Sequence, residues 1–310
     1  MVVAILLSVM LVQIAAALAI WYAATGWMPA DLALLGAVLA VALVRMAINA
    51  NNFRMARRAG SVVPPEHRLD PLGRLRLFAG EYRASMLSTS WHMLRHRPAP
   101  CFAGTSAALP VLLVHGYGCN GGYWAPLRAL LRREGIRHDA VDLVPVTASI
   151  EDYVPQLEAA VQRLLAATGA PRIVLVCHSM GGLVARAWLR RHPDGAVARI
   201  VTIATPHHGT ALAHLGPGEN ARQMRIGADW LKRLAHDDFG RRALFTSIWS
   251  WHDNIVAPQD SCRLPGAKDI AFGGIGHVAL GSDPRVLRAV LSEVHAAAAL
   301  TPLPTPGTIN

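Results

Sequence analysis

The chain has 310 residues, 53% of them hydrophobic, and a formal net charge of +10. This length allows one catalytic domain of ordinary size together with a smaller segment. The excess charge is concentrated, because ten Arg stand against three acidic residues between Arg45 and Arg97. No nucleic-acid-binding motif accompanies it, so we expect no nucleic-acid partner and attribute the charge to membrane topology.

Residues 2–30 contain no charged side chain, and the run from Val2 to Ala24 is long enough to cross a bilayer as a helix, which needs about 20 residues. A secretory signal peptide would need a basic start and a shorter apolar core, and no Lys or Arg precedes this run. A second apolar run extends from Leu32 to Ala50, interrupted by Arg45. We predict a membrane-anchoring helical hairpin over residues 1–50; a buried hairpin in a soluble protein is the alternative.

The orientation of this hairpin follows from its flanks. Arg54, Arg57 and Arg58 come directly after the second run, and the turn between the runs has no basic residue. The positive-inside rule then places this cluster, and everything after it, in the cytoplasm. If the second run does not insert, the first run alone would anchor the chain and the orientation would be open.

Residues 51–105 form a basic linker followed by a helix. Asp70 and Pro71 suit an N-cap and a first helical residue, and apolar side chains then recur at helical spacing as far as Leu87. This amphipathic helix could lie on the membrane or pack on the catalytic domain.

From residue 106 to 298, short apolar strands alternate with helices, which predicts a mostly parallel sheet wrapped by helices. Residues 211–243 are helical and interrupt this rhythm, so we interpret them as a lid-like insertion. The tail, 299–310, is rich in Pro and is expected to be disordered. The expected strands are Val111–Val114, Ile136–Leu143, Ile173–Val176, Ile200–Ile203, Leu244–Ile248 and Asp269–Phe272, and the expected helices are Trp124–Glu134, Ile150–Ala167, Met180–Arg191 and Pro284–His295.

The strongest chemical signal is the stretch Ile173-Val-Leu-Val-Cys-His-Ser-Met-Gly-Gly182, in which a buried strand runs directly into a helix. It resembles the nucleophile elbow of the α/β-hydrolase superfamily, with Ser179 as the nucleophile. Such a turn needs very small residues on both sides of the Ser. Gly181 and Gly182 meet this need, whereas Cys177 departs from the usual Gly.

A second motif follows the first strand, Val111-Leu-Leu-Val-His-Gly-Tyr-Gly118, and resembles the oxyanion loop of lipases and esterases. The resemblance implies that the backbone N–H groups of Tyr117 and Met180 stabilise the oxyanion. In this motif the His, here His115, usually orders the loop rather than acting as a base.

The acid and the base of such a triad follow the Ser in the chain. The stretch Ser250-Trp-His-Asp-Asn-Ile-Val-Ala-Pro258 resembles the acid loop, and Gly273-Gly-Ile-Gly-His277 resembles the loop that carries the base. The resemblance therefore implies that His277 accepts the proton of Ser179 while Asp253 orients and stabilises the imidazole. Asp260 and Asp237 remain alternative acids.

Thr205-Pro-His-His-Gly-Thr210 resembles a stretch of bacterial lipases that shapes the site and leads into the lid. Loop structure is the favoured role of His207 and His208 over metal ligation. No CxxC pair or zinc-like His spacing occurs, so we predict neither metal nor cofactor.

Together these motifs are similar to bacterial lipases and esterases over about residues 106–298. They imply an α/β-hydrolase fold and a membrane-anchored serine hydrolase, at the bacterial inner membrane, that cleaves carboxylic esters of lipid-like acids through an acyl-enzyme intermediate. The expected partners are a hydrophobic ester substrate and the membrane, with no obligate protein partner inferred. An acyltransferase, thioesterase or amidase could use the same triad.

Two further classes compete. A non-catalytic membrane scaffold could reuse the fold, although it would not need the triad residues. A membrane transport component is disfavoured, because two helices are too few for a transporter core and neither carries an acidic group in its apolar run.

Overall fold

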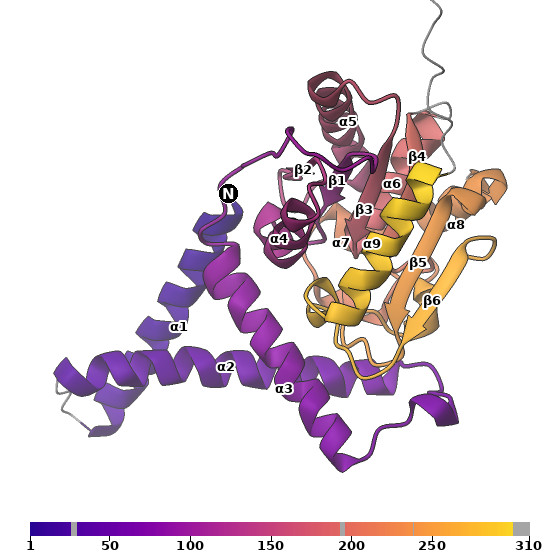
Figure 1. The fold of residues 1–310 in the computed structure, drawn as a ribbon. Coiled ribbons are helices and arrows are strands. Elements are labelled where there is room, and N and C mark those ends of the chain that lie inside the picture. Colours follow the sequence, from indigo (N-terminus) through magenta and orange to yellow (C-terminus); the bar gives the residue numbers. More distant parts are fainter. Residues whose placement is uncertain (26–29, 193–195, 238, 300–310) are drawn as a thin grey trace, which may run out of the picture.

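The computed structural model describes residues 1–25, 30–192, 196–237 and 239–299 (Figure 1). Within the described part, a sheet domain follows three N-terminal helices. The tail predicted to be disordered is 299–310; its first residue, Ala299, ends a helix, and residues 300–310 lie outside the described residues.

The sheet contains six strands in the order β2-β1-β3-β4-β5-β6, and every neighbouring pair is parallel. This arrangement confirms the predicted parallel sheet. All carboxyl ends lie along one edge, where ligands bind in open α/β sheets. The strands are β1 (Val111–Val114), β2 (His138–Val141), β3 (Ile173–His178), β4 (Val197–Ile203), β5 (Phe245–Ser250) and β6 (Lys268–Phe272).

Helices cover both faces of the sheet. Residues of α5 (Val154–Thr168) and α6 (Met180–Arg191) share one core with alternate residues of β1 and β3. The other residues of these strands share a second core with α4 (Ala125–Arg133) and α9 (Pro284–Ala299). Burial on both faces explains why β1 and β3 are almost continuously apolar rather than alternating. Each fully buried Val or Leu contributes about 1.5–3 kcal/mol of transfer free energy.

The insertion predicted at 211–243 is helical in its described part. It contains the 3₁₀ helix η5 (Ala211–Leu215), α7 (Glu219–Gln223), α8 (Asp229–Asp237) and the beginning of η6 (Phe239–Leu244). The Tyr117 hydroxyl donates a hydrogen bond to the Pro217 carbonyl at 2.7 Å, so the insertion contacts the loop after β1.

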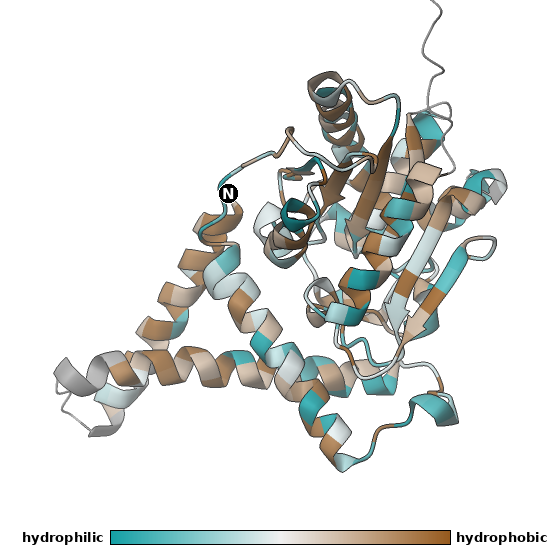
Figure 2. Cartoon of the chain, in the orientation of Figure 1, coloured by the Kyte–Doolittle hydropathy of each residue, from teal (hydrophilic) through white to brown (hydrophobic). Residues whose placement is uncertain are grey.

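Two long helices, α1 (Val2–Thr25) and α2 (Ala30–Arg58), begin the chain. Both are long and apolar enough to cross a membrane. Figure 2 shows apolar residues along α1 and the first part of α2, outside the sheet domain. The last two turns of α2 extend beyond the expected boundary at residue 50, because no Gly or Pro lies between Ala50 and Gly60.

The third helix, α3 (Pro71–Leu87), begins as the sequence predicts, with the Asp70 carboxylate accepting the Gly73 N–H at 2.7 Å. It packs on the sheet domain and on α2. Of the two arrangements expected for this helix, on the membrane or on the catalytic domain, the structure has the second. The short helices η1 (Pro65–His67) and η2 (Ser88–His92) flank it. Two contacts join α3 to α2: the Tyr82 hydroxyl donates to the Ala42 carbonyl at 2.9 Å, and the Phe53 and Phe78 rings lie 6.0 Å apart.

Candidate active site

Ser179 occupies a strained turn between β3 and α6. Its φ of 52° and ψ of −125° lie where side-chain-bearing residues are rare, which costs about 1–3 kcal/mol. A hydrogen bond of 2.8 Å from the Ser179 N–H to the Ile203 carbonyl holds the turn against β4. A Cβ on Gly181 would lie 2.6 Å from the Val114 carbonyl oxygen, so the turn requires glycine there.

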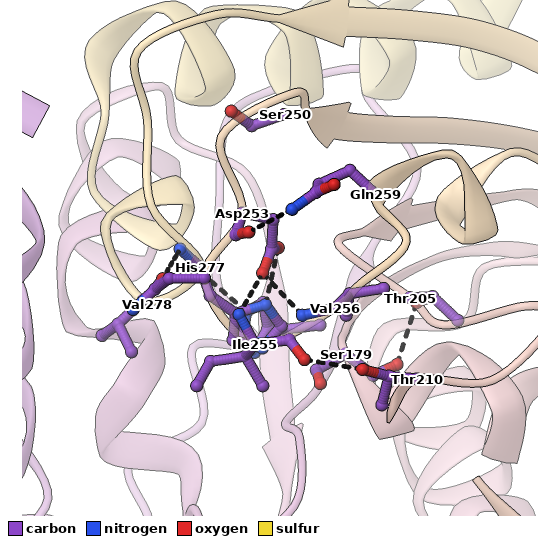
Figure 3. Close-up of polar contacts among 12 residues, drawn as sticks. Ser179, Thr205, Thr210, Ser250, Asp253, Ile255, Val256, Gln259, His277 and Val278 are labelled. Carbon is purple, nitrogen blue, oxygen red and sulfur yellow. Dashed lines mark hydrogen bonds and ion pairs between the residues drawn. The ribbon is translucent and has the colours of Figure 1, made fainter. Parts of the chain in front are cut away.

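The two residues expected to serve Ser179 come from the next strand ends. Asp253 follows β5 and His277 follows β6, and their Oδ2 and Nδ1 atoms lie 2.7 Å apart (Figure 3). The other carboxylate oxygen of Asp253 accepts backbone N–H groups of Ile255 at 2.7 Å and Val256 at 2.8 Å. The carboxylate is buried, and these contacts fix its orientation toward His277.

The His277 loop lies against the end of β3 that carries Ser179. The His178 ring lies 4.6 Å from the His277 ring, and its Nε2 atom lies 3.2 Å from the His277 carbonyl oxygen. Figure 3 draws Ser179 beside the Asp253–His277 pair. The structure thus brings the three predicted residues to one edge of the sheet.

Electrostatics distinguish the two neighbouring imidazoles. Burial by itself lowers the pKa of His277, but the charge and hydrogen bond of Asp253, aided by the charge of Glu81, outweigh burial and raise it above the ordinary 6.5. Burial, reinforced by a cationic His277, holds the pKa of His178 well below its usual range. At neutral pH His178 is uncharged, and His277 is suited to hold a proton transiently.

The loop after β1 lies directly over the Ser179 turn. A Cβ on Gly116 would stand 2.9 Å from the Ser179 Cβ, so glycine permits this close approach. Leu143 N–H donates to His115 Nε2 at 2.9 Å, and His115 Nδ1 lies 2.9 Å from the Gly116 carbonyl oxygen. Both ring nitrogens are thus used within the fold, as expected for a residue that orders the loop. Tyr117 lies in this loop, and Met180 begins α6.

The Thr205–Thr210 stretch supports the turn from the other side. The Thr205 hydroxyl donates to the Ser179 carbonyl at 2.9 Å. His207 is buried, its Nε2 atom lies 3.3 Å from the Thr202 hydroxyl, and its carbonyl accepts a hydrogen bond from Arg186 at 3.1 Å. Burial lowers the pKa of His207 well below its usual range. These contacts fit a structural role.

The alternative acids have different surroundings: the Asp237 carboxylate is ion-paired, and Asp260 is exposed. Asp237 forms an ion pair of 3.3 Å with Arg190 on α6, and the backbone N–H of exposed Asp260 donates to Ser61. His277 is paired with Asp253.

Two site neighbours were not anticipated from the sequence. Glu81 of α3 accepts hydrogen bonds from the backbone directly after His277, and Asn254 accepts the His277 N–H at 3.0 Å. Asn254 adjoins the acid in the motif and could have been noted for that reason. Glu81 belongs to no motif, so only the tertiary packing of α3 reveals it.

This sheet, with its strained Ser turn and its flanking helices, is the α/β-hydrolase fold. Residues 110–247 match the sequence model of the family described as alpha/beta hydrolase fold. The chain is an α/β-hydrolase-fold protein similar to lipases and esterases. The mature lipase BlEst2 of Bacillus licheniformis superimposes with a TM-score of 0.56 at 18% identity, covering 64% of this chain and 99% of that lipase.

Sequence relatives are similar over shorter stretches. A triacylglycerol lipase of Burkholderia plantarii is 36% identical over 129 residues, which is 37% of this chain and 35% of that lipase. A pimeloyl-[acyl-carrier protein] methyl ester esterase of Vibrio cholerae is 38% identical over 96 residues, which is 31% of this chain and 36% of the esterase. The matched stretch thus spans about a third of the length of each of these relatives.

Proposed function

We propose that this protein is a membrane-anchored serine hydrolase of carboxylic esters, with Ser179 as nucleophile, His277 as base and Asp253 as acid. The observation that carries the proposal is the 2.7 Å contact between His277 Nδ1 and Asp253 Oδ2 beside the strained Ser179 turn. A non-catalytic scaffold would have no need for a buried carboxylate–imidazole pair next to a strained serine.

In the proposed reaction, Ser179 Oγ attacks the ester carbonyl carbon while His277 Nε2 takes the hydroxyl proton. The carbonyl oxygen becomes an oxyanion, which the N–H groups of Tyr117 and Met180 would stabilise. The intermediate collapses, and the alcohol leaves with the proton from His277. Water then attacks the acyl-Ser179 carbonyl carbon and gives a proton to His277. His277 passes this proton to Ser179 Oγ as the bond between Oγ and the acyl carbon breaks, which releases the acid and restores the free enzyme. Asp253 stabilises the imidazolium at both stages.

An ester with a lipid-like acyl group fits best. The relatives include triacylglycerol lipases, and the helical insertion contacts Tyr117 through Pro217. Exposed apolar side chains on α1 and α2 would hold the enzyme near hydrophobic substrates. They include Leu7, Leu11, Val12, Leu35, Val38, Leu39 and Leu43.

Membrane anchoring is supported by the length and composition of two helices, Val2–Ala23 and Leu35–Arg58. We infer that α1 crosses the bilayer and that α2 returns, with Arg45 at the interface and the segment after Asn49 on the sheet domain. The hydrolase domain would then lie in the cytoplasm, beside the Arg cluster that follows the second apolar run.

A panel of p-nitrophenyl esters of increasing chain length tests the proposed reaction. We expect hydrolysis by the full chain in detergent, rising from acetate toward longer acyl groups, and none above background with Ser179→Ala. Preference for a thioester or an amide of the same acid would instead assign the triad to a thioesterase or amidase. Product formed only with added alcohol or amine acceptors would indicate an acyltransferase.

A further inference from the structure

Glu81 is a buried acidic residue that the proposed reaction does not use. Glu81 is 1% exposed, and it lies on the face of α3 that packs against the sheet domain. One carboxylate oxygen accepts the N–H of Val278 at 3.0 Å and the other accepts the N–H of Ala279 at 2.9 Å. Burying a carboxylate is unfavourable unless its oxygens accept hydrogen bonds. These two hydrogen bonds are therefore a specific interaction and not a consequence of nonspecific packing.

The loop that carries His277 is shaped around this carboxylate. A Cβ on Gly276 would stand 2.5 Å from a Glu81 oxygen, so glycine leaves the space that the side chain occupies. Glu81 therefore contacts the residue before His277 and bonds to the two residues after it. Its position constrains the base loop on both sides of the imidazole.

The acid loop has a corresponding contact from α2. Asn254 follows Asp253, and its side-chain N–H donates to Asn49 Oδ1 at 3.2 Å. The Asn254 oxygen accepts the His277 N–H at 3.0 Å. Asn49 is 6% exposed, so this amide contact is also buried. A hydrogen-bonded path thus runs from α2 through the acid loop to the base.

We propose that Glu81 and Asn49 are positioning residues that set the geometry of the Asp253–His277 pair, so that the N-terminal helices complete the active site. Each makes its own contact with a catalytic loop, and the Tyr82–Ala42 hydrogen bond and the Phe53–Phe78 contact join their helices. This inference rests on the proposed esterase activity.

The Glu81 carboxylate gives the proposal a distinctive signature in the pH dependence. Burial raises the pKa of Glu81, while the backbone N–H groups of Ala279 and Val278 and the charge of His277 favour its ionised form. The groups around His277 are Asp253 from the acid loop, Glu81 from α3, His178 from the end of β3, and Tyr123 beside Glu81 and His178. His178 and Tyr123 are neutral near pH 7, because burial holds the pKa of His178 well below and that of Tyr123 well above its usual range. Asp253 and Glu81 both favour the charged imidazolium. Removing the Glu81 charge should therefore lower the pKa of His277 and move the rising limb of kcat/KM to lower pH.

Esterase kinetics of the full chain in detergent test this. Glu81→Gln should lower kcat by about tenfold to a hundredfold, because small misplacements of catalytic groups have effects of that size. KM should stay within about twofold, because neither residue is expected to touch substrate. In Glu81→Gln, the rising limb of the plot of kcat/KM against pH should move to lower pH. Asn49→Ala should lower kcat without moving the limb, since the amide carries no charge.

Glu66→Gln at an exposed residue and Asn51→Ala at a half-buried residue serve as matched controls, because they make the same chemical changes outside this network. Both should behave as wild type. Wild-type kcat and an unmoved limb in Glu81→Gln would overturn the inference. A lower kcat with an unmoved limb and a lowered melting temperature would also overturn it, by showing a purely structural role. If Glu81→Gln does not fold, unchanged kcat in Asn49→Ala decides against the proposal. A wild-type chain that neither hydrolyses esters nor reacts with a fluorophosphonate would refute the proposed function itself, and the inference with it.

Discussion

At the scale of single residues, the site depends on a few buried groups whose polar atoms are satisfied. The Asp253 carboxylate accepts two backbone N–H groups and faces His277, and the Thr205 hydroxyl supports the Ser179 carbonyl. A carboxylate held in this way fixes the orientation of the imidazole. The chemistry we propose therefore depends on positions that the surrounding backbone determines.

Substitutions in the proposed triad should not be additive. Ser179→Ala and His277→Ala should each lower kcat by about 10⁴-fold to 10⁶-fold, and the double variant should lose little more, because the residues act as one unit. Asp253→Asn should cost about 10⁴-fold. Steady-state kinetics on one ester substrate check this. If the fold-loss of kcat in the double variant equals the product of the two single losses, the two residues act independently.

The activity should depend on pH through His277. The base must be neutral to accept the Ser179 proton, and Asp253 and Glu81 raise the pKa of His277 above the ordinary 6.5. The value of kcat/KM should therefore rise as the pH increases through a midpoint above 6.5, and then level off. Asp253→Asn should move the midpoint to lower pH. A profile in wild type that is already level at pH 6.5 would show that another group is the base.

At the scale of elements, the sequence predicted what local patterns encode. All six strands occur where short apolar runs were found, and the helices after β1, β3 and β6 follow within a few residues of their expected bounds. Asp70 caps α3 as its position before Pro71 indicates. The end of α2 was missed, because the expectation followed hydrophobicity and the helix continues through polar residues to Arg58.

The placement of α3 depends on tertiary contacts, which local sequence patterns do not encode. Whether α3 lies on a membrane or on the domain depends on the partner of Glu81, which is a backbone loop about 200 residues later in the chain. A lone acidic residue in an amphipathic helix carries no signal of that contact. Ser179, Asp253 and His277 could be proposed from the sequence, because each lies in a recognisable motif at or shortly after the end of a strand.

The elbow's departure from glycine at Cys177 gives a prediction at this scale. Cys177 lies in β3 between Val114 of β1 and Thr202 of β4, and it is fully buried. Cys177→Gly should keep activity within about twofold and destabilise the fold by roughly 0.5–1 kcal/mol, because glycine gains freedom in the unfolded chain.

Cys177→Leu is the matched enlargement. Overpacking a filled core typically costs about 1–3 kcal/mol, and here it would also displace the Ser179 turn. Thermal melts and esterase rates of the two variants test the argument. An inactive but folded glycine variant would reveal a role for the thiol that packing does not explain.

At the scale of the whole molecule, the N-terminal helices are suited both to contact a membrane and to support the active site. Their apolar surfaces suit a bilayer, and their polar residues Glu81 and Asn49 contact the catalytic loops. The same segment would thus hold the enzyme near hydrophobic substrates and complete its site. The Arg cluster at the end of α2 favours a cytoplasmic domain.

Cysteine accessibility in intact cells tests that orientation. A Thr308→Cys variant, made in a background where the half-buried Cys101 and Cys119 are replaced by Ser, carries a new thiol near the C-terminus. An impermeant thiol reagent should label it after lysis and not before. Labelling in unbroken cells would place the hydrolase domain outside the cytoplasm and leave the catalytic proposal unchanged.

The central claim is that Ser179 is an activated nucleophile, and covalent labelling tests it most directly. The full chain is treated with a fluorophosphonate, digested, and analysed by mass spectrometry. We predict one phosphonylated peptide carrying the adduct on Ser179, with labelling abolished in Ser179→Ala and strongly slowed in His277→Ala. An unlabelled wild-type chain, or an adduct on another residue that persists in Ser179→Ala, would contradict the account.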